Sequence, residues 1–291
     1  MNILVTGSHG QLGNELQKIA KKNQSIDWFF TDVNDLDITS GFEVDNFFVS
    51  NHINICINCA AYTAVDKAED EPEFANRINA DAVRNLADAC LQANALLIHI
   101  STDYVFDGEN YKPYEENDPI KPISVYGHTK ANAEIILAGH EANSVIIRTS
   151  WLYSSVGNNF VKTMIRVGND RPEIRVVSDQ VGTPTWAYDL AEAIFRICIL
   201  NAEKNIKKIY HFSNEGVISW YDFAVAIMEL ENIACKVVPI ESKDYPVKTK
   251  RPFYSVLNKT KYKNDLKAEI PFWRDSLKKC LEEIHGQNQT R

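Results

Sequence analysis

The chain lacks any long hydrophobic run, and it is short of basic residues. No apolar segment among its 291 residues approaches the ~20 residues of a membrane-spanning helix, so we expect no membrane partner. Its 31 Lys and Arg residues oppose 39 Asp and Glu residues, and the formal net charge of -8 disfavours nucleic-acid binding because phosphates require a basic face. The chain enters a strand-like segment directly, without the features of a signal peptide, so we expect a cytoplasmic protein.

Cysteine is also scarce, with six residues spread over the chain. Such a distribution is typical of reduced, buried thiols rather than of a disulfide framework. Cys56 and Cys59 have the spacing of a redox or zinc pair. However, they belong to a segment with the pattern of a buried strand, where residues three apart point to opposite faces. We therefore interpret both as core residues.

The first half of the chain alternates short apolar runs with helical patterns, which predicts an α/β fold with a Rossmann-type, doubly wound parallel sheet. The segments predicted as strands are 2–6, 26–31, 53–58, 96–100, 144–148 and 208–213. The segments predicted as helices are 11–20, 75–93, 125–139, 159–167, 188–200, 219–230 and 272–284. In the helix over 75–93 the apolar residues, Ile78 among them, share one face, and Ser219 is the expected N-cap of the helix over 219–230. We expect residues 1–150 to form a dinucleotide-binding domain, with a helix and a strand around 188–215 returning to its sheet, and residues 151–291 to form mostly a smaller substrate-binding lobe.

A glycine-rich loop follows the first predicted strand. Gly7, Gly10 and Gly13 open the first predicted helix, which is the context that a dinucleotide-binding motif requires. Glycine permits the tight turn and lets a pyrophosphate approach the backbone, while the helix N-terminus faces the phosphates. A plain strand-to-helix turn is the alternative, but the place of the loop at the first strand favours dinucleotide binding.

An acid stands where a cofactor ribose would lie. Asp32 ends the second predicted strand about 20 residues beyond the loop, a position from which a carboxylate accepts hydrogen bonds from adenosine ribose hydroxyls. Because an aspartate repels a 2′-phosphate and no Arg or Lys adjoins it in sequence, we favour NADH over NADPH. The alternative is an acid that only caps the loop. Asp37, followed by Ile38, either approaches the adenine or caps the next helix.

Three further residues suggest hydride chemistry. Tyr126 and Lys130 are four residues apart in a predicted helix and share one face. A nearby ammonium favours the tyrosinate, so we expect a lowered tyrosine pKa. Thr102 ends a predicted strand and is placed to hydrogen-bond a substrate oxygen. In the reducing direction, hydride reaches a carbonyl carbon while Tyr126 protonates the oxygen. Tyr-x-x-x-Lys occurs by chance in helices, but its combination with the glycine loop makes chance a poor explanation.

Longer blocks of sequence carry a resemblance to a known family. They span residues 58–69, 101–108, 126–130, 148–151, 179–185 and 251–255. On these blocks the chain resembles the extended short-chain dehydrogenases that act on nucleotide sugars, and more narrowly the dTDP-4-dehydrorhamnose reductase family. The resemblance covers nearly the whole chain. It implies reduction of the C4 carbonyl of dTDP-4-dehydro-L-rhamnose by NADH or NADPH, the last step of dTDP-L-rhamnose synthesis.

The resemblance also implies roles for individual residues. Those implied at the cofactor are Gly10, Gln11 and Leu12 at the pyrophosphate, Asp32, Asp37 and Ile38 at the adenosine, and Ala60, Ala61 and Tyr62 alongside. Those implied at the nucleotide sugar are Thr102, Asp103, Trp151 and Arg251. A guanidinium suits a diphosphate because it binds phosphate through two parallel hydrogen bonds. The alternative for Arg251 is a solvated cation beside other basic residues.

A metal and a second copy of the chain are also implied. Some members of the family bind magnesium through glutamates at a dimer interface, and Glu15 matches one such position. The alternative explanation is an acid that only complements the positive end of a helix dipole. We therefore expect Mg²⁺ and a homodimer from the resemblance alone.

Other functions remain open on the sequence. A nucleotide-sugar 4,6-dehydratase needs a glutamate base after Ser-Thr-Asp, and Tyr104 takes that place here. A 4-epimerase or another nucleotide-sugar 4-ketoreductase shares the Tyr126 and Lys130 pair, although residues 104–108 favour the reductase. A third possibility is a non-catalytic regulatory subunit on the same scaffold, as in methionine adenosyltransferase.

Overall fold

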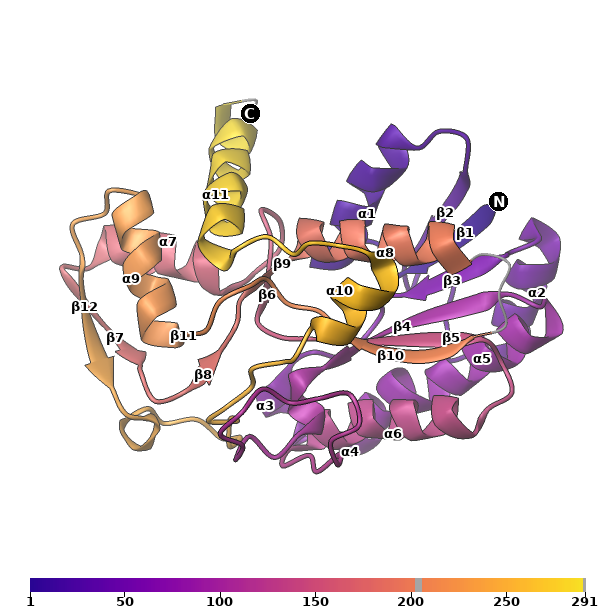
Figure 1. The fold of residues 1–291 in the computed structure, drawn as a ribbon, viewed down its shortest axis with the longest axis horizontal. Helices are drawn as coiled ribbons and strands as arrows, with labels where there is room; N and C mark the ends of the chain where they lie inside the picture. The colour runs from indigo at the N-terminus through magenta and orange to yellow at the C-terminus, as the bar shows by residue number, and fades with distance from the viewer. Residues whose placement is uncertain (202–205, 290–291) are drawn as a thin grey trace.

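A six-stranded sheet forms the centre of the structure, a computed structural model that describes residues 1–201 and 206–289. The strands run in the order β10-β5-β4-β3-β1-β2, and every neighbouring pair is parallel (Figure 1). Their bounds are β1 (Asn2–Thr6), β2 (Asp27–Thr31), β3 (Ile55–Asn58), β4 (Leu96–Thr102), β5 (Ser144–Thr149) and β10 (Lys207–His211). The predicted Rossmann-type parallel sheet is confirmed.

Helices cover both faces of this sheet because alternate strand residues point to opposite sides. In β1, Ile3 and Val5 pack with α1 (Gln11–Lys22) and α8 (Ala187–Asn201) on one face. Leu4 packs on the other face, where α2 (Gly41–Asn51), α5 (Ala82–Gln92) and α6 (Val125–Gly139) lie. Cys56 and Cys59 divide between the two faces in the same way, and all six cysteines are free. The interpretation as a core thiol is confirmed for Cys56, whereas Cys59 packs against the core but is half-buried and also lines a pocket.

The segment predicted as one helix over 75–93 is interrupted. It consists of α4 (Pro72–Asn76), the π-helical turn η1 (Arg77–Asp81) and α5. Inside this turn the buried Asn79 accepts a hydrogen bond from the Tyr62 backbone N–H (2.8 Å) and donates one to Thr129 Oγ1 (2.9 Å). Ile78, predicted on the buried face, is only half-buried and lines a pocket. The spacing of apolar residues did not reveal this wider turn, because the turn is only five residues long and few of them are apolar.

A smaller lobe follows the first five strands of the sheet. It contains α7 (Phe160–Asp170), β7 (Glu173–Val177), α9 (Trp220–Leu230), β12 (Lys236–Ile240) and α11 (Trp273–Gln289). Short pairs join β6 (Leu152–Tyr153) to β9 (Thr185–Trp186) and β8 (Val181–Gly182) to β11 (Ile218–Ser219). Ser219 caps α9 in a reciprocal capping box with Asp222, as predicted for this serine. The lobe lies beside the sheet, away from α2 and α5 (Figure 1).

The remaining short elements are α3 (Val65–Ala68), η2 (Asp103–Val105), η3 (Ser242–Asp244) and α10 (Thr260–Leu266). Of these, α10 packs against α8 and β10, and α3 and η2 pack against α6. Within residues 1–201 and 206–289, no helix is both long and apolar enough to cross a lipid bilayer.

Candidate active site

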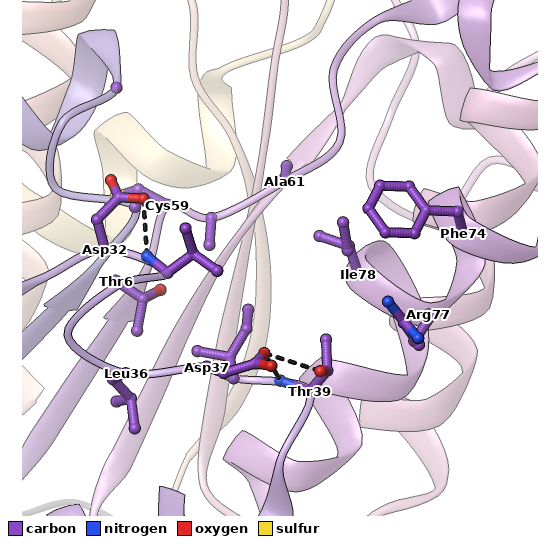
Figure 2. Close-up of a pocket in the computed structure, with 15 residues that line it drawn as sticks. Thr6, Asp32, Leu36, Asp37, Thr39, Cys59, Ala61, Phe74, Arg77 and Ile78 are labelled. Atoms are coloured by element: carbon purple, nitrogen blue, oxygen red, sulfur yellow. Dashed lines mark hydrogen bonds between the residues drawn. The ribbon is translucent and has the colours of Figure 1, made fainter. Parts of the chain in front are cut away.

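Three pockets follow one another from the carboxyl edge of the sheet into the smaller lobe. The β2 pocket, of about 350 Å³, is lined by residues that include Thr6, Gly7, Gly10, Asp32, Asp37, Ile38, Thr39, Ala60, Ala61, Phe74, Arg77 and Ile78 (Figure 2). The central pocket, of about 560 Å³, shares Gly7, Gly10, Cys59 and Ala61 with it. The lobe pocket, of about 340 Å³, shares Tyr104 with the central pocket. Parallel α/β sheets place their ligands at this edge.

The glycine loop lies where the first two pockets meet. Gly7 has a φ of +63°, and a Cβ there would lie 2.7 Å from the backbone of Ala60. A Cβ on Gly13 would lie 2.5 Å from the Cα of Ser8. The loop therefore packs against its neighbours without side chains, and α1 begins at Gln11 directly beyond it. Gly10, Gln11, Leu12 and Gly13 all line the central pocket, as a phosphate-binding loop requires.

The two predicted adenosine-site acids both line the β2 pocket. Asp32 Oδ2 accepts a hydrogen bond from the backbone N–H of His9 at 3.1 Å, which links the end of β2 to the glycine loop. Asp37 Oδ1 accepts bonds from the backbone N–H and the hydroxyl of Thr39, at 2.9 and 2.7 Å. Ser40, not Asp37, caps α2, so the capping alternative for Asp37 is wrong.

Tyr62 lies differently from the other residues of its group. Ala60 and Ala61 line the β2 pocket, whereas the side chain of Tyr62 lines neither the β2 pocket nor the central pocket. Its hydroxyl donates to Glu71 at 2.8 Å, and its ring packs edge-on against Phe74, with ring centroids 5.6 Å apart. Tyr62 thus reaches the β2 pocket only through Phe74.

The predicted catalytic trio meets in the central pocket. Thr102 ends β4, while Tyr126 and Lys130 lie in the first turns of α6, and all three line the pocket. Ser124 fixes the start of α6 by accepting a hydrogen bond from the backbone N–H of Gly127 at 3.1 Å. A Cβ on Gly127 would lie 2.3 Å from the carbonyl oxygen of Tyr104, so this close approach of α6 to η2 requires glycine.

The protonation behaviour of this trio differs from the expectation. Burial raises the pKa of Tyr126, and the hydroxyl of Thr102 opposes the shift. Burial also lowers the pKa of Lys130 to about 8, against the attraction of Glu134. The expected lowering of the tyrosine pKa is therefore wrong: burial, with Asp103 and Tyr104 nearby, raises it, while the Lys130 amine donates to the carbonyl of Ile100 at 2.7 Å. In this arrangement Tyr126 is a neutral phenol that carries a proton to donate.

A buried chain of side chains extends from Lys130 into the sheet. Lys130 Nζ lies 3.2 Å from His99 Nε2, and His99 Nδ1 lies 3.2 Å from Asn58 Nδ2. Asn58 Oδ1 accepts bonds from Thr6 Oγ1 (2.7 Å) and from the Ala60 backbone N–H (3.2 Å), which fixes its amide orientation.

The amide orientation determines the tautomer of His99. The amide NH₂ of Asn58 donates to Nδ1, so the neutral ring carries its proton on Nε2 and points it at Lys130. Burial and the nearby Lys130 both lower the pKa of His99, which keeps the ring neutral. A charged ammonium would place two donors face to face, so this contact acts with burial to favour the neutral amine of Lys130.

Two predicted substrate residues lie on the sheet and lobe sides of the central pocket. Asp103 is buried beside Thr102, and burial raises its pKa to about 6. Trp151 has a φ of +49°, and its ring stacks on Trp220 of the lobe with centroids 3.7 Å apart. Sequence reasoning missed Trp220, because nothing in its local pattern indicates a partner in a distant segment.

Arg251 lies at the junction of the sheet and the lobe. It lines the lobe pocket and forms an ion pair with Asp66 at 2.6 Å, while Tyr104 lies within 3.4 Å of its guanidinium. The alternative of a freely solvated cation is therefore wrong. Asp66 was part of a motif in the sequence, but only the fold places it against Arg251.

Glu15 lies in surroundings that do not fit a divalent cation. It is the fifth residue of α1, is fully buried and lies beyond the first turn, so the helix-dipole explanation does not apply either. Lys18 Nζ lies 2.6 Å from a Glu15 oxygen and 2.6 Å from an oxygen of Glu283. The ammonium thus occupies the place between the two carboxylates. Across the described part of the chain, no group of three or more His, Cys, Asp or Glu could hold a metal ion.

The doubly wound sheet, the glycine loop after β1 and the Tyr126–Lys130 pair on α6 define the class of this protein as an extended short-chain dehydrogenase. A family model described as the RmlD substrate binding domain matches residues 1–285. The chain is 41% identical to dTDP-4-dehydrorhamnose reductase of Aggregatibacter actinomycetemcomitans, over 95% of this chain and 97% of that protein. This chain belongs to the dTDP-4-dehydrorhamnose reductase family.

Solved structures agree with this assignment. A dTDP-4-dehydrorhamnose reductase of Clostridium acetobutylicum is 43% identical, with a TM-score of 0.92 over 98% of this chain and 100% of that one. The dTDP-4-dehydrorhamnose reductase of Bacillus anthracis, solved in complex with NADP, is 38% identical, with a TM-score of 0.92 over 97% of this chain and 99% of that one.

Proposed function

We propose that this protein reduces the C4 carbonyl of dTDP-4-dehydro-L-rhamnose to dTDP-L-rhamnose, with NADH or NADPH as the hydride donor. One observation carries the proposal: Thr102, Tyr126 and Lys130 share a pocket that continues into the glycine loop. The named activity of relatives at 41 and 43% identity supports it, since both cover nearly the whole chain.

The residues present fit a dinucleotide. The loop of Gly7, Gly10 and Gly13 makes a tight turn that leaves no room for side chains at Gly7 and Gly13, and the N-terminus of α1 presents backbone N–H groups directly beyond it. Gln11 and Leu12 would hold the pyrophosphate, while Asp32, Asp37, Ile38, Ala60 and Ala61 would enclose the adenosine. The nicotinamide ring supplies the hydride when it is bound. Because Asp32 faces the ribose side, we propose a preference for NADH.

The chain's own side chains then manage the proton. Tyr126 keeps its proton at neutral pH, because burial raises its pKa, and donates it to the oxygen formed at C4. Thr102 orients the carbonyl by a hydrogen bond. Lys130 is held on Ile100 and would bind the nicotinamide ribose from that position. Tyr104 takes the place of the glutamate base of a dehydratase, and burial raises its pKa to about 12, so it holds its proton at neutral pH.

The nucleotide sugar would lie between the sheet and the lobe. Asp103 and Trp151 would contact the sugar in the central pocket, and Arg251 would bind the diphosphate from the lobe pocket. We propose residues 1–150, with α8 and β10, as the cofactor-binding domain, and 151–291 as mostly the substrate-binding lobe. The proposal includes a homodimer, tested by light scattering, but no magnesium, because Lys18 already neutralises Glu15.

The test follows NADH and NADPH oxidation by the purified protein, with the keto-sugar nucleotide generated in situ by the upstream dehydratase and epimerase. We expect enzyme-dependent oxidation with dTDP-L-rhamnose as the product. A 4-epimer without net oxidation would favour the epimerase alternative. Absence of turnover with both cofactors, although both bind, would refute the reductase and favour the regulatory-subunit alternative.

A further inference from the structure

Trp151 has a backbone conformation that a bulky residue rarely adopts. Its φ of +49° lies in the left-handed region, where the Cβ of an L-residue crowds its own backbone. The Trp151 carbonyl accepts a hydrogen bond from the Thr185 N–H at 3.1 Å, and the Ser150 hydroxyl donates to the carbonyl of Thr183 at 2.8 Å. Such outliers persist only where the surrounding structure holds them, and they cluster at ligand sites. The strain at Trp151 therefore calls for a group that holds this residue.

The indole of Trp151 is held by two segments of the lobe. Trp220, the first residue of α9, stacks on it with ring centroids 3.7 Å apart and ring planes 10° apart. Gly182 of β8 lies against the same ring, and a Cβ there would be 2.7 Å from Trp151 Cε2. Phe160 of α7 packs on Trp220 with centroids 4.6 Å apart, so Trp220 is itself supported.

The two tryptophans connect two pockets. Trp151 lines the central pocket together with Thr102 and Tyr126, whereas Trp220 lines the lobe pocket together with Arg251. None of the described residues that line the central pocket comes from α9. Because Trp220 covers one face of the Trp151 ring, α9 decides where this ring lies in a pocket that α9 itself does not reach.

We propose that Trp220 is a positioning residue, which holds the strained Trp151 against the sugar and so makes sugar binding depend on the lobe. The inference rests on the proposed function, which places the sugar at Trp151. A stacked aromatic pair stabilises beyond the area it buries, and its loss would free Trp151 to leave the left-handed region. The ring would then withdraw from the sugar, while the glycine loop and Tyr126 would keep their places.

The experiment compares dTDP-L-rhamnose with dTDP, which lacks the sugar. Both are titrated calorimetrically without cofactor, so that no hydride transfer occurs. In Trp220→Leu the ratio of the affinity for dTDP-L-rhamnose to that for dTDP should fall about 2–10-fold. Trp220→Tyr, which keeps an aromatic ring, should retain most of the ratio. Tyr221→Leu, at the next residue of α9 and outside both pockets, is the matched control and should leave the ratio unchanged.

A double-variant cycle separates positioning from direct contact with the ligand. If Trp220 acts through Trp151, then Trp220→Leu should add little to the loss already caused by Trp151→Leu. Stacked indoles should also give an exciton couplet in far-ultraviolet circular dichroism, which Trp151→Phe and Trp220→Phe should each abolish. Additive losses, an unchanged ratio in Trp220→Leu, or a couplet that survives either variant would overturn the inference.

Steady-state kinetics distinguish this inference from the proposed function. In Trp220→Leu the KM for the keto-sugar nucleotide should rise about 2–10-fold, while kcat and the KM for NADH are retained. An equal loss of NADH affinity would indicate a general structural defect and would count against a positioning role. A protein whose sugar binding depends on Trp220 but which reduces no keto-sugar would refute the proposed function and leave this inference standing. Turnover with the same KM in the variant would do the reverse.

Discussion

Because Lys130 is buried, we expect the free energy of unfolding to increase as the pH rises above about 8. Its pKa falls from the ordinary 10.5 to about 8, because burial removes the amine from water, beside the neutral His99. The unfolded chain therefore holds this proton at pH values where the folded chain has lost it. Stability then rises with pH through the window between about pH 8 and pH 10.5, and the full cost of the buried charge is present at pH 7.

The size of this effect follows from the shift. A fall from 10.5 to about 8 corresponds to about 3 kcal/mol, acquired at roughly 1.4 kcal/mol for each pH unit. The variant Lys130→Met removes the titrating group and leaves every other one in place. The unfolding free energy of the unaltered protein minus that of the variant should therefore increase by about 3 kcal/mol between about pH 7 and pH 10.5.

Urea unfolding across that range measures the difference. Lys208→Met is the matched control, because its ion pair with Asp265 raises the pKa of that lysine. Its contribution is fully present below the unfolded value of 10.5 and should stay constant up to about pH 10. A difference between the unaltered protein and Lys130→Met that stays flat over the same window would show that the amine is not desolvated, and would refute the reasoning.

Three further predictions concern the site and its support. Tyr126→Phe should bind NADH normally and lose about 10²–10⁴-fold in kcat, whereas Tyr111→Phe, at a 90% exposed tyrosine, should not; unchanged turnover in the first would exclude it as proton donor. Glu134→Gln should lower the free energy of unfolding by about 3–5 kcal/mol, because it strands the buried guanidinium of Arg148, and the double variant Glu134→Leu/Arg148→Met should recover most of the loss in urea titrations. EDTA should leave both turnover and oligomeric mass unchanged, because the buried carboxylate of α1 is paired with Lys18; a loss restored by Mg²⁺ would contradict this.

Local sequence was sufficient for much of the fold. The spacing of apolar residues predicted α6 over 125–139 and the capping serine of α9, because each depends on residues within one or two helical turns. The sequence also predicted the glycine loop after β1, since such a loop requires residues without side chains at fixed intervals. The pattern could not show the π-helical turn η1, because one wider turn displaces the apolar periodicity by less than the pattern resolves.

The sequence by itself determined which chemical groups are available: a dinucleotide loop, an acid after β2, and a threonine, tyrosine and lysine at a strand end and a helix start. The tertiary structure decided their states and their partners. Burial raises the pKa of Tyr126 and lowers that of Lys130. The fold also places Lys18 between Glu15 and Glu283, where a metal was expected. Arg77 lines the β2 pocket because the folded chain brings the π-helical turn η1 against the end of β2. Desolvation and contacts between distant segments depend on the folded surroundings, which no local pattern of residues encodes.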